Sequence, residues 1–352
     1  MRALAKPPLV ASSVVPPEDI DQSRAQPQEM TFAIPISVLG RSALPCPNCG
    51  RPARKAGFRQ TSRGPAQKLY CPHCGRSGTA TPLPRRQYPP TVILTAVTQY
   101  NLGSTLAETC RIIRRRFKQD VPQSTLHSWL KEFESVCTFT PLRRKFAVSE
   151  EDTLLTKVFS HRQEYRFEFH RLKLNLLAKT EFPQIRRYLW WVREHCPNNL
   201  FTSDAGSRCS QTSLTHVRLA TWRRPDNNAV ALAKLGLILA KRATERHPAI
   251  QRFMLANDSA TIAVEVPVFL YPDEAPDLWL AAPLTGHIDV LQIRTRKLWI
   301  LDYKPDARRE TKAKYQTYLY ARALSVRAGV PFSRIRFAYF DDKDYYEVSP
   351  AL

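Results

Sequence analysis

A strand-turn-strand-helix pattern near the C-terminus constrains the fold of this 352-residue chain more than any other feature. Apolar stretches predict strands at 287–293 and 298–304, separated by a polar turn at 294–297. A helix is expected to follow at 310–328. The pattern therefore predicts a hairpin that leads directly into a helix.

Charged residues mark the point where the two strands of this hairpin would splay. Side chains alternate faces along a strand, so Asp302 and Lys304 point the same way, and Asp289 can face the same cleft if the strands pair about their turn. Two carboxylates suit Mg²⁺ or Mn²⁺, which also takes water and phosphate oxygens. We predict Asp289 and Asp302 as metal ligands. Lys304 is expected to orient or activate a water, or to neutralise charge on a phosphate.

The following helix carries polar side chains at four-residue spacing, which places them on one face. These side chains, expected to contact phosphate in the cleft, are Lys312, Gln316 and Tyr320. A solvated, charged hairpin rim is the alternative interpretation of the acids. The apolar flanks GHIDVL and LWILDYK favour a central strand, where unpaired charges are costly.

This pattern resembles the RecB-like branch of the PD-(D/E)xK nuclease superfamily, whose motif has glycine and aspartate on one strand, D-Y-K on the next and Q-x3-Y on a helix. The matching residues are Gly286 and Asp289, then Asp302, Tyr303 and Lys304, then Gln316 and Tyr320. The resemblance covers roughly the last 140 residues, a size that suits one domain. It implies a metal-dependent DNA nuclease with a mixed central sheet, in which Asp289, Asp302 and Lys304 form the catalytic core.

The same resemblance assigns a further acid and leaves one ligand open. Glu265, in the apolar run VEVPVFL, matches the acidic residue often found just upstream of the motif. Many relatives carry a histidine on an earlier helix, but the helix expected at 235–246 offers only Glu245 and His247 at its end. No cysteine follows Cys209, so no iron–sulphur cluster is expected.

Two C-P-x-C-G segments near the N-terminus predict a second metal site. Each places two thiolates on a tight turn, and two such knuckles close a tetrahedral Zn²⁺ site. The predicted structural zinc ligands are Cys46, Cys49, Cys71 and Cys74. Unrelated turns or a redox dithiol are the alternatives. No acidic residue lies between Glu29 and Glu108, which favours phosphate contacts by this basic region.

The next block, 87–136, predicts three helices in helix-turn-helix organisation, with the third as the reader of the DNA major groove. The third helix should bury Leu126, Trp129, Leu130 and Phe133. The side chains expected to contact DNA are Gln123, Ser124, Thr125, His127, Ser128 and Lys131 on this helix, with Arg114, Arg115 and Arg116 beside the backbone. A plain helical bundle is the alternative. The ribbon and this block together resemble the N-terminal DNA-binding region of some insertion-sequence transposases.

These segments predict a multidomain α+β chain. The expected parts are a disordered leader (1–40), a zinc ribbon (41–86), a helix-turn-helix domain (87–136), a helical connector (137–200) and an α/β nuclease domain of the PD-(D/E)xK, restriction-endonuclease-like type (201–352). Trp190 and Trp191 in the connector could pack internally or anchor a symmetric dimer. The scattered histidines and cysteines of 161–216 are interpreted as core and surface residues rather than a further metal site.

Composition agrees with a polyanionic partner. The formal net charge is +22, which favours nucleic acid. No apolar run is long enough for a membrane span, so we expect no membrane partner and a cytoplasmic, nucleoid-associated protein. A Walker loop and a dinucleotide-binding motif are both absent, which argues against ATP-driven and redox chemistry.

The leading hypothesis is a DNA-targeted, Mg²⁺-dependent endonuclease from a mobile element, phage or defence system. It would act with a transposase or another protein of the same element, or as a homodimer on DNA. The alternatives are a DNA-binding regulator or transposition accessory with an inactive nuclease fold, and an end-processing exonuclease. Sequence leaves the target and the cut polarity open.

Overall fold

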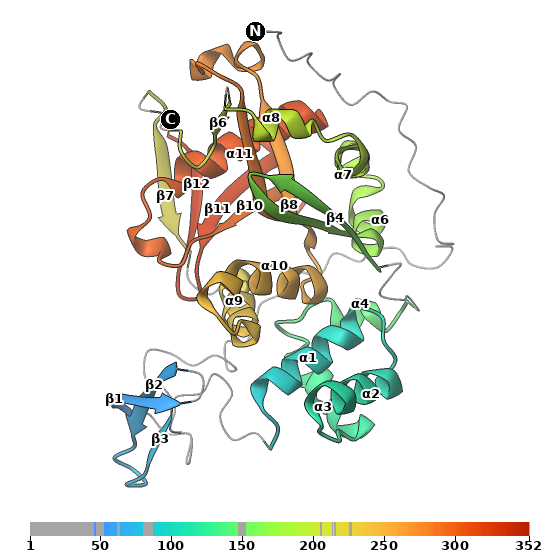
Figure 1. The fold of residues 1–352 in the computed structure, drawn as a ribbon, viewed down its shortest axis with the longest axis vertical. Coiled ribbons are helices and arrows are strands. Elements are labelled where there is room, and N and C mark those ends of the chain that lie inside the picture. The colour runs from blue at the N-terminus through green and yellow to red at the C-terminus, as the bar shows by residue number, and fades with distance from the viewer. Residues whose placement is uncertain are drawn as a thin grey trace.

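The computed structural model describes residues 46, 53–61, 64–79, 87–146, 153–204, 206–212, 214, 216–224 and 227–351. The leader expected at 1–40 and the predicted zinc ligand Cys49 lie outside these residues. The described chain is a mixed α+β structure built around one large mixed sheet, as predicted (Figure 1).

The large sheet has nine strands, in the order β4-β5-β8-β9-β10-β11-β12-β7, with β6 beside β9. The β10–β11 and β6–β9 pairs are parallel and the other pairs antiparallel. The strands are β4 (Leu154–His161), β5 (Gln163–His170), β6 (Ser207–Arg208), β7 (Leu219–Arg223), β8 (Thr261–Leu270), β9 (Leu284–Arg294), β10 (Lys297–Tyr303), β11 (Ile335–Phe340) and β12 (Tyr345–Pro350).

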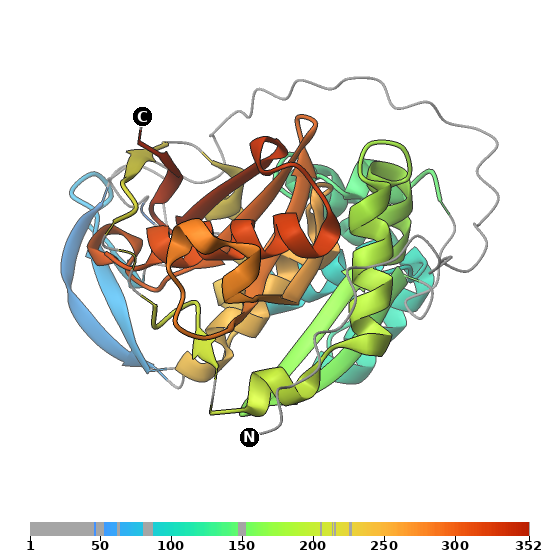
Figure 2. The ribbon, with the colours of Figure 1, turned by 90° about the horizontal axis from the view of Figure 1, so that it is seen from above.

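Helices cover both faces of this sheet. One face carries α6 (Arg171–Ala178), α7 (Pro183–His195), α8 (Asn198–Thr202) and α11 (Ala313–Ala328). In Figure 2 the green helices α6 and α7 run beside the green strands β4 and β5. The opposite face is covered by α9 (Asn228–Leu239) and α10 (Arg246–Asn257). Burial on both faces explains why the central strands are nearly continuous apolar runs.

The predicted hairpin is present. β9 and β10 pair about Thr295 and Arg296, which both have positive φ (48° and 56°), as a two-residue hairpin turn with the strands' right-handed twist requires. Leu298 and Ile300 join the core under α11, whereas Leu301 joins the core under α10. The predicted division of the strand between two faces is therefore confirmed, and the helix begins at Ala313 rather than at 310.

The expectation of a mostly helical connector is wrong for 154–170. This segment forms the β4–β5 hairpin, turning at Arg162, and β5 pairs with β8. The reason is visible in YRFEFH, where aromatic and charged residues alternate with the two-residue period of a strand. The connector thus contributes two strands to the large sheet.

The second half of the connector is helical, as expected. Tyr188 and Trp191 of α7 are buried in the core, and the ring of Trp190 packs edge-to-face against Phe169 at 5.2 Å. Trp191 therefore packs internally, while Trp190 is half-buried beside Phe169.

The block at 87–146 folds as α1 (Pro90–Asn101), α2 (Leu106–Phe117), α3 (Gln123–Phe133) and the short α4 (Thr140–Arg143). A capping box at Thr105 starts α2, because its hydroxyl accepts from the Glu108 amide while Glu108 accepts from the Thr105 amide. The block shares a hydrophobic core with α9, α10 and the sheet. The Asn101 amide donates to Asn257 Oδ1 at 2.8 Å, which joins α1 to α10 by a buried hydrogen bond.

A small separate sheet precedes this block. Its strands, β1 (Arg54–Thr61), β2 (Gly64–Tyr70) and β3 (Ser77–Thr79), pair antiparallel in sequence order. Among the residues that the structure describes, no helix is both long and apolar enough to cross a membrane.

Candidate functional site

The end of the β9–β10 ladder positions the first carboxylate. Regular pairing stops at Leu301 and Val290, so the next residues of the two strands are no longer joined by the ladder. The Tyr303 backbone amide instead donates to Asp289 Oδ2 at 2.8 Å, and Asp289 is buried. The strands separate at the position that the sequence predicted.

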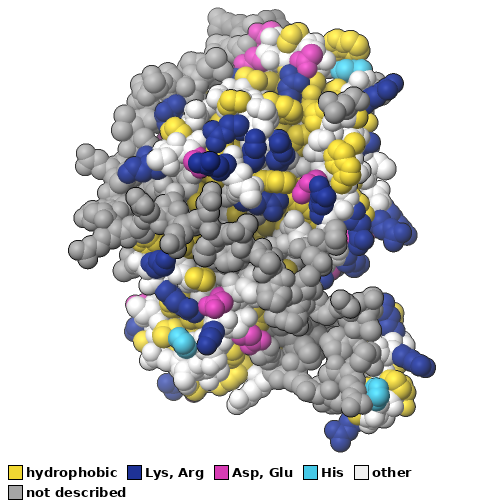
Figure 3. Space-filling model, turned by 180° about the vertical axis from the view of Figure 1, so that it is seen from behind, with side chains coloured by type: hydrophobic (Ala, Val, Ile, Leu, Met, Phe, Trp, Pro, Cys, Tyr) yellow, Lys and Arg dark blue, Asp and Glu magenta, His cyan; other side chains and the backbone are white. Residues whose placement is uncertain are grey.

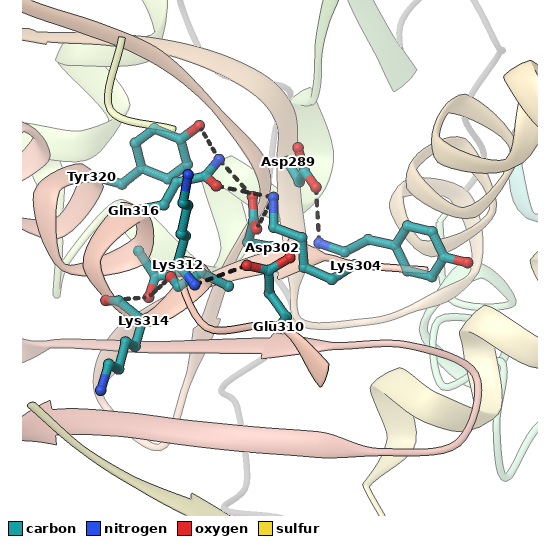
Figure 4. Close-up of polar contacts among 11 residues, drawn as sticks. Asp289, Asp302, Lys304, Glu310, Lys312, Lys314, Gln316 and Tyr320 are labelled. Carbon is teal, nitrogen blue, oxygen red and sulfur yellow. Dashed lines mark hydrogen bonds and ion pairs between the residues drawn. The ribbon is translucent and has the colours of Figure 1, made fainter. Parts of the chain in front are cut away.

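Asp302 sits at the centre of a polar network that spans β10 and α11 (Figure 4). Lys304 Nζ lies 2.8 Å from Asp302 Oδ2 and donates to Gln316 Oε1 at 2.9 Å. The Gln316 side-chain amide donates to Asp302 Oδ1 at 3.2 Å and to the Tyr320 hydroxyl at 2.8 Å. The structure therefore brings together Asp302, Lys304, Gln316 and Tyr320, as expected.

Lys312 has a different environment from the other two residues of the predicted stripe. It is exposed at the start of α11, whereas Gln316 and Tyr320 are buried. Figure 4 shows its side chain running along the same side of the helix, while Lys314 points away. Lys312 is thus at the rim of the cleft rather than within it.

Glu265 is positioned by β8. The register pairs Val264 with Val290 and Val266 with Ile288, which places Glu265 across from Asp289. Glu265 has a φ of 50°, a left-handed conformation that is costly for a side chain this size, and backbone strain of this kind clusters at functional sites. The Gln251 amide on α10 donates to Glu265 Oε1 at 2.7 Å, which holds the carboxyl group in place.

Crowding of these acids perturbs their titration. Burial, and then the Asp289 carboxylate, raise the pKa of Glu265 to about 8. The same two causes raise the pKa of Asp302 to about 7, against the opposing effect of Lys304. Carboxyl groups forced to share a buried site favour a state in which one holds a proton or a cation neutralises them.

Lys304 responds in the opposite direction. Burial lowers its pKa, but the carboxylates of Asp302 and Asp289 outweigh this effect and raise it above the ordinary value. The side chain is therefore an ammonium at neutral pH. Of the two roles expected for Lys304, charge neutralisation fits this state better than proton abstraction.

Gly286 on β9 leaves room for Tyr320 of α11. A Cβ atom at this position would lie 2.4 Å from Cε1 of Tyr320, well inside contact distance. A side chain here would displace the tyrosine that Gln316 contacts. The glycine of the predicted motif is thus required by close packing between β9 and α11.

These groups line one cavity of about 260 Å³. Its wall also contains residues that the sequence did not assign to the site, namely His161, Gln163, Tyr165, Phe201, Arg208, Ser210, His247, Thr285 and His287. His161 is far from the motif in sequence, and only pairing of β4, β5, β8 and β9 in one sheet brings it here. The Gly286 to Asp289 motif, which contains His287, was the one available signal.

His247 bears on the third ligand that the sequence leaves open. The expected single helix is two helices, α9 and α10, and His247 lies in the first turn of α10 rather than beyond a helix end. It lines the cavity, and its Nε2 is buried without a hydrogen-bond partner among the described residues. The imidazole is therefore a candidate ligand beside the carboxylates.

The donor set fits a divalent cation. Asp289, Asp302 and Glu265 offer carboxylate oxygens, and a positive ion would offset the repulsion that the Asp289 carboxylate exerts on the other two. Among the described residues these three acids do not bring three ligand oxygens within 4.8 Å of one another, so at most two of them are placed to share one ion. Two are enough for Mg²⁺ or Mn²⁺, which bind through one or two carboxylates and keep several waters.

The cysteine motif does form such a group. The Sγ atoms of Cys46, Cys71 and Cys74 lie within 4.8 Å of one another, and Cys46 Sγ is 3.6 Å from Cys74 Sγ. Two thiolates on one tetrahedral zinc ion are about 3.8 Å apart, given Zn–S bonds of about 2.3 Å. This cluster can bind a metal ion, and Cys49 is the expected fourth ligand.

The exposed face of α3 has the predicted composition. Leu126, Trp129, Leu130 and Phe133 are buried, so the interpretation of the apolar face is confirmed. The predicted DNA contacts Gln123, Ser124, His127, Ser128 and Lys131 are exposed and Thr125 is half-buried; Arg114, Arg115 and Arg116 are exposed at the end of α2.

No protein-family model matches the chain, and neither does any curated protein or solved structure.

Proposed function

We propose that the chain is a divalent-metal-dependent nuclease that hydrolyses phosphodiester bonds of DNA. The observation that carries the proposal is the single cavity that unites the ends of β9 and β10 with α11. It gathers Asp289, Asp302, Lys304 and Gln316, with Glu265 opposite Asp289. Buried acids with raised pKa values beside a specific cation are typical of functional sites, since such crowding is costly for a purely structural role.

In this proposal Asp289 and Asp302 hold the metal ion, and Glu265 or His247 would complete the ligand set only by moving closer to them. The ion supplies Lewis-acid activation of the phosphate and of a water molecule. Lys304 stabilises the negative charge that builds on the phosphate oxygens. Gln316 orients Lys304 and Asp302 through its two hydrogen bonds, and Tyr320 holds the Gln316 amide.

DNA is proposed as the substrate because the chain is strongly basic and carries an exposed helical face. The face in Figure 3 shows Lys and Arg side chains spread across it, with few acidic side chains between them. Exposed polar residues on α3 and the basic end of α2 would read DNA and contact its backbone. A zinc ion at Cys46, Cys71 and Cys74 would stabilise the small sheet as an additional DNA-binding part.

Purified full-length protein incubated with supercoiled and linear DNA, in Mg²⁺, Mn²⁺ or EDTA, tests the proposal. Site-specific cutting supports an endonuclease, and progressive digestion of ends supports an exonuclease. Asp289→Asn and Asp302→Asn should abolish cleavage while DNA binding persists, whereas the matched control Asp306→Asn, on the exposed loop after β10, should cut normally. Metal-independent binding with no turnover by the wild type would refute the nuclease and leave a DNA-binding accessory protein.

The single site also predicts the mode of cutting. One metal site addresses one phosphodiester, so a monomer should nick, and a duplex break needs two sites of opposite polarity. The second site would come from a homodimer on DNA or from a partner enzyme such as a transposase of the same element. Analytical ultracentrifugation with target DNA distinguishes these: one chain per duplex that yields clean double-strand breaks would contradict this reasoning.

A further inference from the structure

One wall of the cavity is basic and aromatic, and it contains none of the carboxylates proposed to bind metal. It is formed by Arg208 with Tyr165, His161 and His287. Arg208 lies on β6, which pairs in parallel with β9 so that Arg208 is opposite Thr285. Asp289 is four residues further along β9, or about 13 Å at the usual rise of a strand. The guanidinium and the carboxylates therefore enter the same cavity from different ends.

The aromatic and histidine side chains that surround Arg208 form a rigid support. The Tyr165 ring stacks on His287 at 3.6 Å, and the Phe201 ring stacks on His161 at 4.1 Å. His161 Nδ1 is 2.9 Å from His287 Nε2, and His161 Nε2 is 2.8 Å from Asn198 Oδ1. The amide oxygen of Asn198 can only accept, so His161 donates to it and accepts from His287, which fixes both rings.

Arg208 has hydrogen-bonding capacity that this wall does not use. Its Nη2 donates to the His161 backbone oxygen at 3.3 Å, and the guanidinium lies beside the Tyr165 hydroxyl, where it opposes the rise in the pKa of Tyr165 that burial causes. Among the described residues it makes no ion pair with a carboxylate. Lys304, in contrast, is already engaged by Asp302 and Gln316.

The charge balance of the cavity indicates what Arg208 binds. The described lining holds three carboxyl groups, and its two permanently basic side chains are Lys304 and Arg208. An arginine fork with unused donors, fixed on a rigid wall, matches the oxygens of a phosphate. Because Arg208 sits opposite Thr285, about 13 Å along β9 from Asp289, it is placed for a phosphate other than the one at the carboxylates.

We propose that Arg208, on its Tyr165, His161 and His287 support, forms a binding subsite for a second phosphate of the strand being cut, next to the phosphate that is hydrolysed. This proposal rests on the proposed nuclease function and names a further part of its substrate site. The subsite sets the register of the strand, because holding the neighbouring phosphate places the reactive one at the carboxylates.

A methylphosphonate scan tests the subsite without relying on turnover. A fluorescent oligonucleotide is made in versions that each carry one uncharged methylphosphonate, and binding to full-length Asp302→Asn protein in Mg²⁺ is followed by anisotropy. One position beside the cleavage site should weaken binding about tenfold, and this dependence on position should vanish in the Arg208→Ala protein. Arg208→Lys should retain part of it, because charge remains but the fork is lost.

Arg162 provides the matched control. It lies in the nearby β4–β5 turn, outside the cavity lining, and contacts Ser203 and Asp204. Arg162→Ala should leave the loss at that position unchanged, and thermal melting checks that each variant is folded. The same positional loss in Arg208→Ala, or no positional loss with Arg208 intact, would overturn the subsite. A positional loss that depends on Arg208 in a protein that never cleaves DNA would support the subsite and refute the nuclease.

Discussion

Replacing Glu265 by glutamine should make the metal-free protein more stable than wild type, by a difference in the free energy of unfolding that grows as the pH rises. The substitution keeps the shape of the side chain and an oxygen that can accept from Gln251. It removes the acid that lies across from Asp289 and whose pKa is raised from 4.5 to about 8 by burial and by that carboxylate. The comparison therefore isolates the cost of placing this charge in the site.

The sign and size follow from proton linkage. Below pH 4.5 the Glu265 carboxyl is protonated in both folded and unfolded chains and contributes nothing. Between 4.5 and about 8 the folded state holds a proton that the unfolded state has released, so the free energy of unfolding falls as the pH rises. A pKa difference of one corresponds to about 1.4 kcal/mol, which sets an upper limit of about 5 kcal/mol above pH 8. Glutamine has no such dependence.

The assay is thermal and urea unfolding of wild-type and Glu265→Gln protein in buffers freed of divalent cations, from pH 5.5 to pH 7.5. We expect the variant to gain about 1–3 kcal/mol relative to wild type over this range. A gain of 1 kcal/mol raises Tm by about 2–4 °C for a unit of this size. Added Mg²⁺ should reduce the difference, because the ion neutralises the carboxylates.

Glu164, an exposed glutamate on β5, supplies the control, since Glu164→Gln should leave the pH profile of the wild type unchanged. Parallel profiles for wild type and Glu265→Gln would show that Glu265 carries no charge penalty in the folded protein. The electrostatic account of the site would then be wrong.

Three further changes probe other parts of the chain. Lys304→Ala should lower the single-turnover rate constant of DNA cleavage by about 10²-fold or more, with little change in DNA affinity. An unchanged rate constant would refute its charge-stabilising role. Gly286→Ala should displace Tyr320 and reduce the cleavage rate about tenfold. The double variant Gly286→Ala/Tyr320→Ala should lose no more of the rate than the more damaging single variant, because both changes act through the same contact. Cys71→Ser should abolish stoichiometric zinc in elemental analysis and weaken DNA binding while leaving the unfolding of the large sheet unchanged; zinc-free wild-type protein would contradict the site.

The parts of the fold that sequence predicted are held by local interactions. The β9–β10 hairpin follows from alternating apolar strands and a short turn, and the helix after it places Gln316 and Tyr320 four residues apart on one face. The buried face of α3 follows from the spacing of Leu126, Trp129, Leu130 and Phe133. In each case the contacts that define the element lie within about thirty residues of one another.

The strands β4 and β5 were not predicted, because a strand far away in the sequence stabilises them. We expect helix here from the charged and aromatic sequence, although YRFEFH alternates with the two-residue period of a strand. The strand conformation is stabilised by pairing of Glu168 and Phe169 with Val264 and Ala263, nearly a hundred residues further along the chain. Propensity within the segment carries no information about such a partner.

The complete cavity was likewise decided by tertiary structure. Asp289, Asp302 and Lys304 could be assigned from the motif, because two paired strands bring them together. Arg208 and His161 contribute to the same cavity only because β6 adds to β9 and because β4 reaches this region through β5 and β8. The local motif thus indicates which residues of the hairpin can carry chemistry. The long-range pairing of strands decided which other side chains face them, because strand pairing between distant segments depends on burial across the whole sheet.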